Sequence, residues 1–280
     1  MILPSISKCE ENKKQLIKKW TKGKVLNHKE LEKRKTFFQN CYVFHHFKIP
    51  QETINHYLTT NTIQDLLPDG LLKSSHEIHA SQLFHPVGIT LDWLDPLFGL
   101  DQFVFFSFGA PQLKTGNYAL VFALPLQKLL DKFEYPQIWV SWGDIFTYAM
   151  DIVGVHQTHK LNKTETSKII RLYQNVIIQP KDIAELAAIY TITHNKSVSE
   201  IINQKWLKEY GYFGPEIKIS NNFPVKHFTH CFVNDLDSTA GKIAKVLYEK
   251  RILPVEPTTD RFFNKDIFKR FYVDYMEFSI

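Results

Sequence analysis

Glu216 opens a stretch in which polar and apolar residues alternate, Glu216-Ile217-Lys218-Ile219. Such alternation is typical of a strand, and Gly211 and Gly214 just before it favour a turn. One carboxylate is therefore expected at the beginning of a strand, where it can stabilise a positive charge that develops in a substrate. The rings of Tyr212 and Phe213 in the same turn can stack on a planar ligand. The alternative is a solvated strand residue, because charged residues are mostly exposed.

Two adjacent histidines and one serine are further candidates for chemistry. His45 and His46 occur in the β-rich segment 41–47, and Ser107 is the only hydroxyl of the apolar strand expected at 102–109. Since successive strand side chains point to opposite faces, one histidine faces the core or a cleft. A register shift of one residue exchanges the two histidines, so both stay candidates. The structural alternatives are a hydrogen-bonded core histidine and a serine bonded to main chain.

Metal and cysteine chemistry fit the sequence less well. His79 follows His76 by three places, where a helical zinc motif needs four, and no metal is expected. Cys9, Cys41 and Cys231 form neither a disulfide framework nor a zinc spacing, which is typical of a reducing compartment. A Cys-His nucleophilic site with Cys41 or Cys231 is an alternative, although neither lies at an expected helix N-terminus that would activate the thiol.

The elements that must position these residues follow from periodicity and capping residues. We expect strands at 41–47, 102–109, 118–124, 137–141, 216–219 and 224–233, with 118–124 as the hairpin partner of 102–109. We expect helices at 7–20, 27–38, 62–67, 125–133, 144–153, 164–177, 181–193, 197–209 and 238–250. Ser7 and Asn27 are the expected N-caps of the first two helices. The predicted fold class is α+β.

The 280 residues are 44% hydrophobic and include 22 Phe, a globular composition that can build a sizeable core. The net charge of +5 is mild, and much of the basic excess lies in the first forty residues. We divide the chain into a basic helical N-terminal extension (1–40), a core (41–235) that includes a helical insertion (141–210), and a C-terminal helical and aromatic segment packed on the core (236–280). A basic arm can contact nucleic acid, an acidic protein or anionic lipid, but a solvated face is commoner.

The expected location is the cytosol, because no N-terminal apolar run of signal-peptide type is present. Export into a host cell by a dedicated secretion system, without a cleaved signal peptide, is the alternative. The apolar stretch from Phe103 to Phe108 is too short for a membrane span. We expect a monomer.

The order of these elements resembles the ADP-ribosyltransferase fold of bacterial toxins and effectors. The similarity covers about Cys41 to Val233 and rests on short motifs in the family's order. These are Phe44-His45-His46-Phe47, the short helix ending Leu66-Leu67-Pro68-Asp69-Gly70-Leu71-Leu72, the strand Val104 to Phe108, its partner Tyr118 to Ala123, a helical block, and the late strand Pro215-Glu216-Ile217-Lys218-Ile219. The resemblance implies a split β-sheet core with N-terminal helices and a helical insertion.

In that family the first strand contributes His or Arg, the second a hydroxyl and a late strand Glu, all around NAD. The resemblance implies that Glu216 stabilises the ribose cation, that His46 holds a ribose hydroxyl, and that Ser107 positions Glu216. With no arginine in 41–47, the chain resembles the histidine class, whose members often have tyrosine where Ser107 stands. The further residues expected to contact NAD or the acceptor are His45, Phe47, Phe106, Tyr212 and Phe213.

The implied function is a mono-ADP-ribosyltransferase that uses NAD as substrate and no metal. Its acceptor would be a macromolecule, a host protein in preference to nucleic acid, and the chain would be a bacterial effector or toxin. Gly214 stands where arginine-modifying members have Glu or Gln, so the resemblance does not point to arginine as the acceptor. The alternatives are a non-catalytic module that binds protein or nucleic acid, hydrolysis of NAD alone, and modification of DNA bases at the same site.

Overall fold

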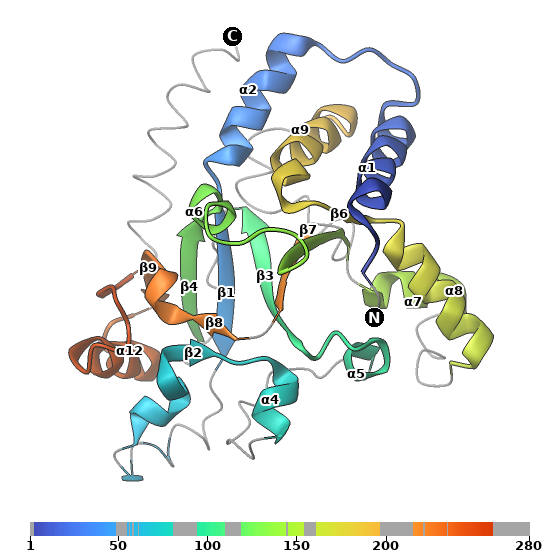
Figure 1. Ribbon diagram of the computed structural model, residues 1–280. Coiled ribbons are helices and arrows are strands. Elements are labelled where there is room, and N and C mark those ends of the chain that lie inside the picture. Colours follow the sequence, from blue (N-terminus) through green and yellow to red (C-terminus); the bar gives the residue numbers. More distant parts are fainter. Residues whose placement is uncertain are drawn as a thin grey trace.

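A mixed sheet lies at the centre of the molecule, and in the part of the chain described below it has eight strands in the order β10-β9-β4-β1-β3-β7-β5-β6 (Figure 1). The computed structural model describes residues 3–48, 55, 57, 59–60, 62–80, 94–109, 119–143, 145–153, 161–196, 215–220, 222–233 and 235–259. All the sheet's pairs are antiparallel except β10 with β9, which is parallel. Together with the helices, this confirms the α+β class.

The strands of the large sheet are β1 (Tyr42–Lys48), β3 (Phe103–Gly109), β4 (Ala119–Pro125), β5 (Ile138–Trp142), β6 (Ile177–Ile178), β7 (Pro215–Ser220), β9 (His230–Val233) and β10 (Pro257–Thr259). A small second sheet pairs β2 (Leu71–Leu72) with β8 (Phe223–Pro224).

The α-helices are α1 (Ile6–Thr21), α2 (His28–Gln39), α4 (Ser75–Ala80), α5 (Leu94–Phe98), α6 (Leu126–Leu130), α7 (Ile145–Val153), α8 (Lys163–Gln174), α9 (Ile183–Thr193) and α12 (Thr239–Glu249). Short 3₁₀ helices occur at η1 (Ile63–Leu66), η2 (Pro68–Gly70), η4 (Pro180–Asp182) and η5 (Val225–His227). None of the helices within the described ranges has the length and apolarity needed to cross a bilayer.

The sheet is weakly joined between β1 and β3. These strands pair only at Tyr42 with Gly109, Val43 with Phe108 and Phe44 with Ser107, whereas β1 pairs with β4 along its whole length. Beyond Phe44 the backbones of β1 and β3 no longer form a ladder. There the side chain of His45 joins the two strands, because its Nδ1 lies 2.8 Å from the Phe105 carbonyl oxygen. The sheet therefore has two halves that share a three-residue seam.

Apolar residues cover both faces of the half that contains β5. On one face Trp142 contacts Trp20 of α1 and Tyr190 of α9, at ring distances of 4.7 and 5.6 Å. On the other face Trp139 packs with Tyr173 of α8, in a cluster that also includes residues of α7. Burial of such large aromatic surfaces on both sides stabilises the strand that lies next to β7.

The N-terminal helices are packed onto the core. Helices α1, α2 and α9 lie side by side (Figure 1), and Phe38 of α2 contacts Phe108 of β3. The side-chain amide of the buried Asn12 donates to the carbonyls of Gln174 and Ile177, at 2.7 and 2.8 Å. This ties α1 to the end of α8 and to β6.

Several predicted elements differ from those observed. The hairpin of 102–109 with 118–124 is wrong, because β4 pairs with β1 and β9 while β3 pairs with β1 and β7. Ser5, and not Ser7, caps α1, whereas Asn27 caps α2 as expected. The strand expected at 224–233 is broken by η5, and 175–177 is not helical since β6 begins at Ile177. The helix expected at 197–209 and the C-terminal aromatic segment fall outside the described residues.

Candidate active site

Glu216 lies between two serines on one face of the sheet. In the ladders Ser107 of β3 is directly opposite Glu216, and Ser141 of β5 is opposite it on the other side. Residues opposite each other in an antiparallel pair project to the same face, with Cβ atoms only about 5 Å apart. The Glu216 side chain is 28% exposed, so it is accessible although it stands within the sheet. Ser107 is also partly exposed.

Of the two histidines, His46 is on the same face as these residues. Phe44 is opposite Ser107 in the β1 to β3 seam, and the strand alternation places His46 on the Phe44 side. The ring of His46 packs edge-on against Phe44, with centroids 5.3 Å apart, and it stays partly exposed. The predicted residues His46, Ser107 and Glu216, from three separate parts of the chain, thus share one face of neighbouring strands.

His45 points to the opposite face, where its ring contacts Phe106 at 5.7 Å. A carbonyl oxygen can only accept, so the Nδ1 that contacts the Phe105 carbonyl carries the proton. Burial lowers the pKa of His45 to about 4, which keeps the ring neutral near pH 7. His45 therefore has the character of a core histidine that closes the gap between β1 and β3.

Two of the four aromatic residues predicted to contact NAD or the acceptor lie on the face opposite Glu216. Phe47 and Phe106 are on the His45 face, where both are buried, and Phe47 packs on Phe122 while Phe106 packs on Phe223. Their rings therefore belong to the core across the sheet from Glu216. Tyr212 and Phe213 lie outside the described residues.

Lys218 was missed by the sequence reasoning. Its side chain is completely buried, and its Nζ donates to the Glu216 carboxylate and, at 2.9 Å, to Ser141 Oγ. The nitrogen also lies near the rings of Phe105, Trp139 and Tyr173. The only sequence signal was the spacing of Lys218 two places after Glu216, which puts both on one strand face.

The structure gives no support to a cysteine nucleophile. Burial raises the pKa of Cys41 and of Cys231 to about 12, so neither is a thiolate near pH 7. His76 pairs with Asp101 at 3.1 Å, and within the described ranges no three His, Cys, Asp or Glu side chains group as metal ligands.

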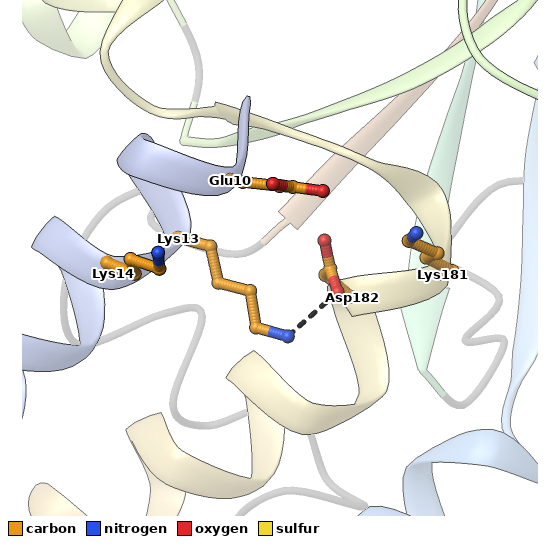
Figure 2. Close-up of a pocket in the computed structure, with 5 residues that line it drawn as sticks. All are labelled: Glu10, Lys13, Lys14, Lys181 and Asp182. Carbon is orange, nitrogen blue, oxygen red and sulfur yellow. Dashed lines mark hydrogen bonds and ion pairs between the residues drawn. The ribbon is translucent and has the colours of Figure 1, made fainter. Parts of the chain in front are cut away.

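A pocket of about 380 Å³ lies elsewhere, between α1 and η4 (Figure 2). It is lined by Glu10, Lys13, Lys14, Lys181 and Asp182. Lys13 pairs with Asp182 at 2.9 Å and with Glu185 at 2.5 Å, so its ammonium is already neutralised by two carboxylates. This pocket contains none of the residues predicted for catalysis, and its charges join α1 to α9.

Comparison with known proteins adds no relative: no protein-family model and no curated protein matches the chain.

Proposed function

We propose that this protein is a mono-ADP-ribosyltransferase that transfers ADP-ribose from NAD to a macromolecular acceptor. The observation that carries the proposal is the alignment of Ser107 with Glu216 across β3 and β7, with His46 on the same face of the next strand. The ADP-ribosyltransferases that the sequence resembles have a histidine or arginine, a hydroxyl and a glutamate in this chain order, and histidine-class members often have tyrosine in the place of Ser107. The two-part sheet with its short β1 to β3 seam also supports a split ADP-ribosyltransferase core.

The chemistry needs a carboxylate in such a position. When the bond between nicotinamide and ribose breaks, its electron pair leaves with nicotinamide and positive charge develops on the ribose. The Glu216 carboxylate stabilises that charge and accepts a hydrogen bond from a ribose hydroxyl. The nucleophile of the acceptor then forms the new bond to the same ribose carbon, and its proton passes to solvent.

In this proposal His46 binds NAD and Ser107 orients the Glu216 carboxylate. The partly exposed imidazole of His46 is suited to a hydrogen bond with a ribose hydroxyl. Ser107 is directly opposite Glu216 in the β3 to β7 ladder, and its hydroxyl is proposed to hold the carboxylate in one orientation. Tyr212 and Phe213, which precede β7 in sequence, are proposed to contact nicotinamide or the acceptor.

A macromolecular acceptor, with a host protein preferred to nucleic acid, completes the proposal, and the chain would act as a bacterial effector or toxin. The net charge of +5 is modest and does not require nucleic acid as the partner. Water in place of the acceptor would make the same site an NAD glycohydrolase.

The test uses the purified chain with NAD labelled in its adenylate part, together with a eukaryotic cell lysate in one series and DNA in another. Label on a protein band supports the proposal, and label on DNA supports the same chemistry with a different acceptor. Free ADP-ribose without labelled macromolecule indicates hydrolysis. If NAD is not consumed and does not raise the melting temperature, the chain is a non-catalytic binding module.

A further inference from the structure

Lys218 is fully buried, which is rare for a lysine and occurs almost only where the ammonium is paired. Its side chain has no exposed surface, whereas that of Glu216, its partner, is 28% exposed. Removing an ammonium group from water costs several kcal/mol, so such a residue persists only where its surroundings compensate. Here the cation lies on the inner side of the pair and the carboxylate on the outer side.

The surroundings of Lys218 hold the ammonium in one place. Its Nζ is 4.8 Å from the ring centroid of Trp139, 5.1 Å from that of Phe105 and 5.5 Å from that of Tyr173. Aromatic faces at such distances attract a cation, most strongly when it is shielded from water. These three rings therefore compensate part of the lost hydration.

A hydroxyl pair completes the arrangement. Ser141 Oγ accepts hydrogen bonds from Lys218 Nζ and from Tyr173 Oη, both at 2.9 Å. Tyr173 itself is anchored in the α7 and α8 cluster and has no exposed surface. Besides Glu216, the ammonium therefore has a hydrogen-bond partner on β5, the strand on the far side of β7 from β3, and Tyr173 of α8 supports that partner.

We infer that Lys218 is a positioning residue for Glu216: it holds the carboxylate directed toward the exposed side of the strand. The inference rests on the proposed function, because it assigns Lys218 a part in that reaction. Without the ammonium, the Glu216 carboxylate would lose its buried hydrogen-bond donor. A charge-assisted hydrogen bond from a buried donor also restricts the carboxylate to one orientation.

The test compares Lys218→Met, which keeps the length and apolar character of the side chain, with Lys242→Met, which removes one exposed lysine on α12. Nicotinamide release gives kcat, and titration of the thermal shift with NAD gives its affinity. We expect kcat to fall about tenfold or more in Lys218→Met, with NAD affinity changed less than about threefold, because positioning acts mainly in the transition state. Lys242→Met should have the same kcat and the same NAD affinity as the wild type.

The two proposals fail in different ways. If the wild type releases nicotinamide and folded Lys218→Met does so equally fast, the inference is wrong and the proposed function stands. If the wild type has no turnover with lysate or DNA, both are wrong.

If Lys218→Met does not fold, Ser141→Ala tests whether Lys218 positions Glu216. It removes the hydroxyl that accepts from Lys218 Nζ and leaves the charge in place. A loss in kcat of about three- to tenfold without loss of NAD affinity supports positioning, and unchanged kcat contradicts it.

Discussion

Ser107 and Glu216 occupy directly opposed positions on β3 and β7, on a face of the sheet that both side chains share. Ser107 is also opposite Phe44 of β1, so it lies between β1, which carries the two histidines, and β7, which carries Glu216. The arrangement brings residues that are far apart in the sequence to one face of the sheet.

Ser107→Ala is expected to lower kcat about three- to tenfold, because the glutamate loses a neighbouring hydroxyl that helps to orient it. Stability should change little, since Ser107 is partly exposed. Steady-state nicotinamide release and the melting temperature measure the two effects. An unchanged kcat would show that Ser107 has no part in orienting Glu216.

The two histidines provide a matched pair, His46→Asn and His45→Asn. We expect the His46 variant to raise the KM for NAD about tenfold while keeping its melting temperature, because the proposed hydrogen bond to a ribose hydroxyl of NAD is lost. The His45 variant should keep the wild-type KM, because His45 faces the other side of the sheet. The opposite result would place NAD on the His45 face.

Stability should depend on pH through His45. The folded-state pKa of about 4 lies below the ordinary value of 6.5, so between these pH values the unfolded chain binds the additional proton. The contribution of neutral His45 is complete above pH 6.5 and is lost as the pH falls toward 4, about 3 kcal/mol at roughly 1.36 kcal/mol per pKa unit. Urea unfolding from pH 7 to 4.5 measures it.

His45→Asn supplies the control for that titration, because the amide can still donate to the Phe105 carbonyl but does not titrate. The variant should lose less stability than the wild type over the same pH range. Equal losses in the two proteins would mean that other groups cause the acid sensitivity.

Asn12→Ala should destabilise the protein by about 2 kcal/mol, because the part-buried carbonyl of Gln174 and the buried carbonyl of Ile177 each lose a hydrogen-bond donor. Nicotinamide release well below the melting temperature should be unchanged, since the side-chain amide of Asn12 donates to the end of α8 and to β6 rather than to β7. Lys14→Ala, an exposed change on the same helix, is the control and should cost almost nothing. A destabilisation equal to that of Lys14→Ala would show that α1 does not depend on this amide.

The sequence predicts the strands that carry the candidate site, because β1, β3, β5 and β7 each have a clear local pattern. Their lateral order is not local information: the expected hairpin of β3 with β4 is wrong because β1 lies between them. Which of His45 and His46 shares a face with Ser107 depends on the register of β1 relative to β3, and the three β1 to β3 pairs define that register. Burial of Lys218 could not be predicted from alternation, since the residues that surround it come from β3, β5 and α8.

The most direct measurement is the rate of nicotinamide release from NAD by the wild type and by Glu216→Gln, in the presence of lysate and below the melting temperature of both. The change keeps the side-chain shape but removes the charge that we propose stabilises the ribose cation. We predict measurable release by the wild type and a loss of about a hundredfold or more in the variant. A glutamine variant as fast as the wild type, or a wild type without release on either lysate or DNA, would contradict the proposed function.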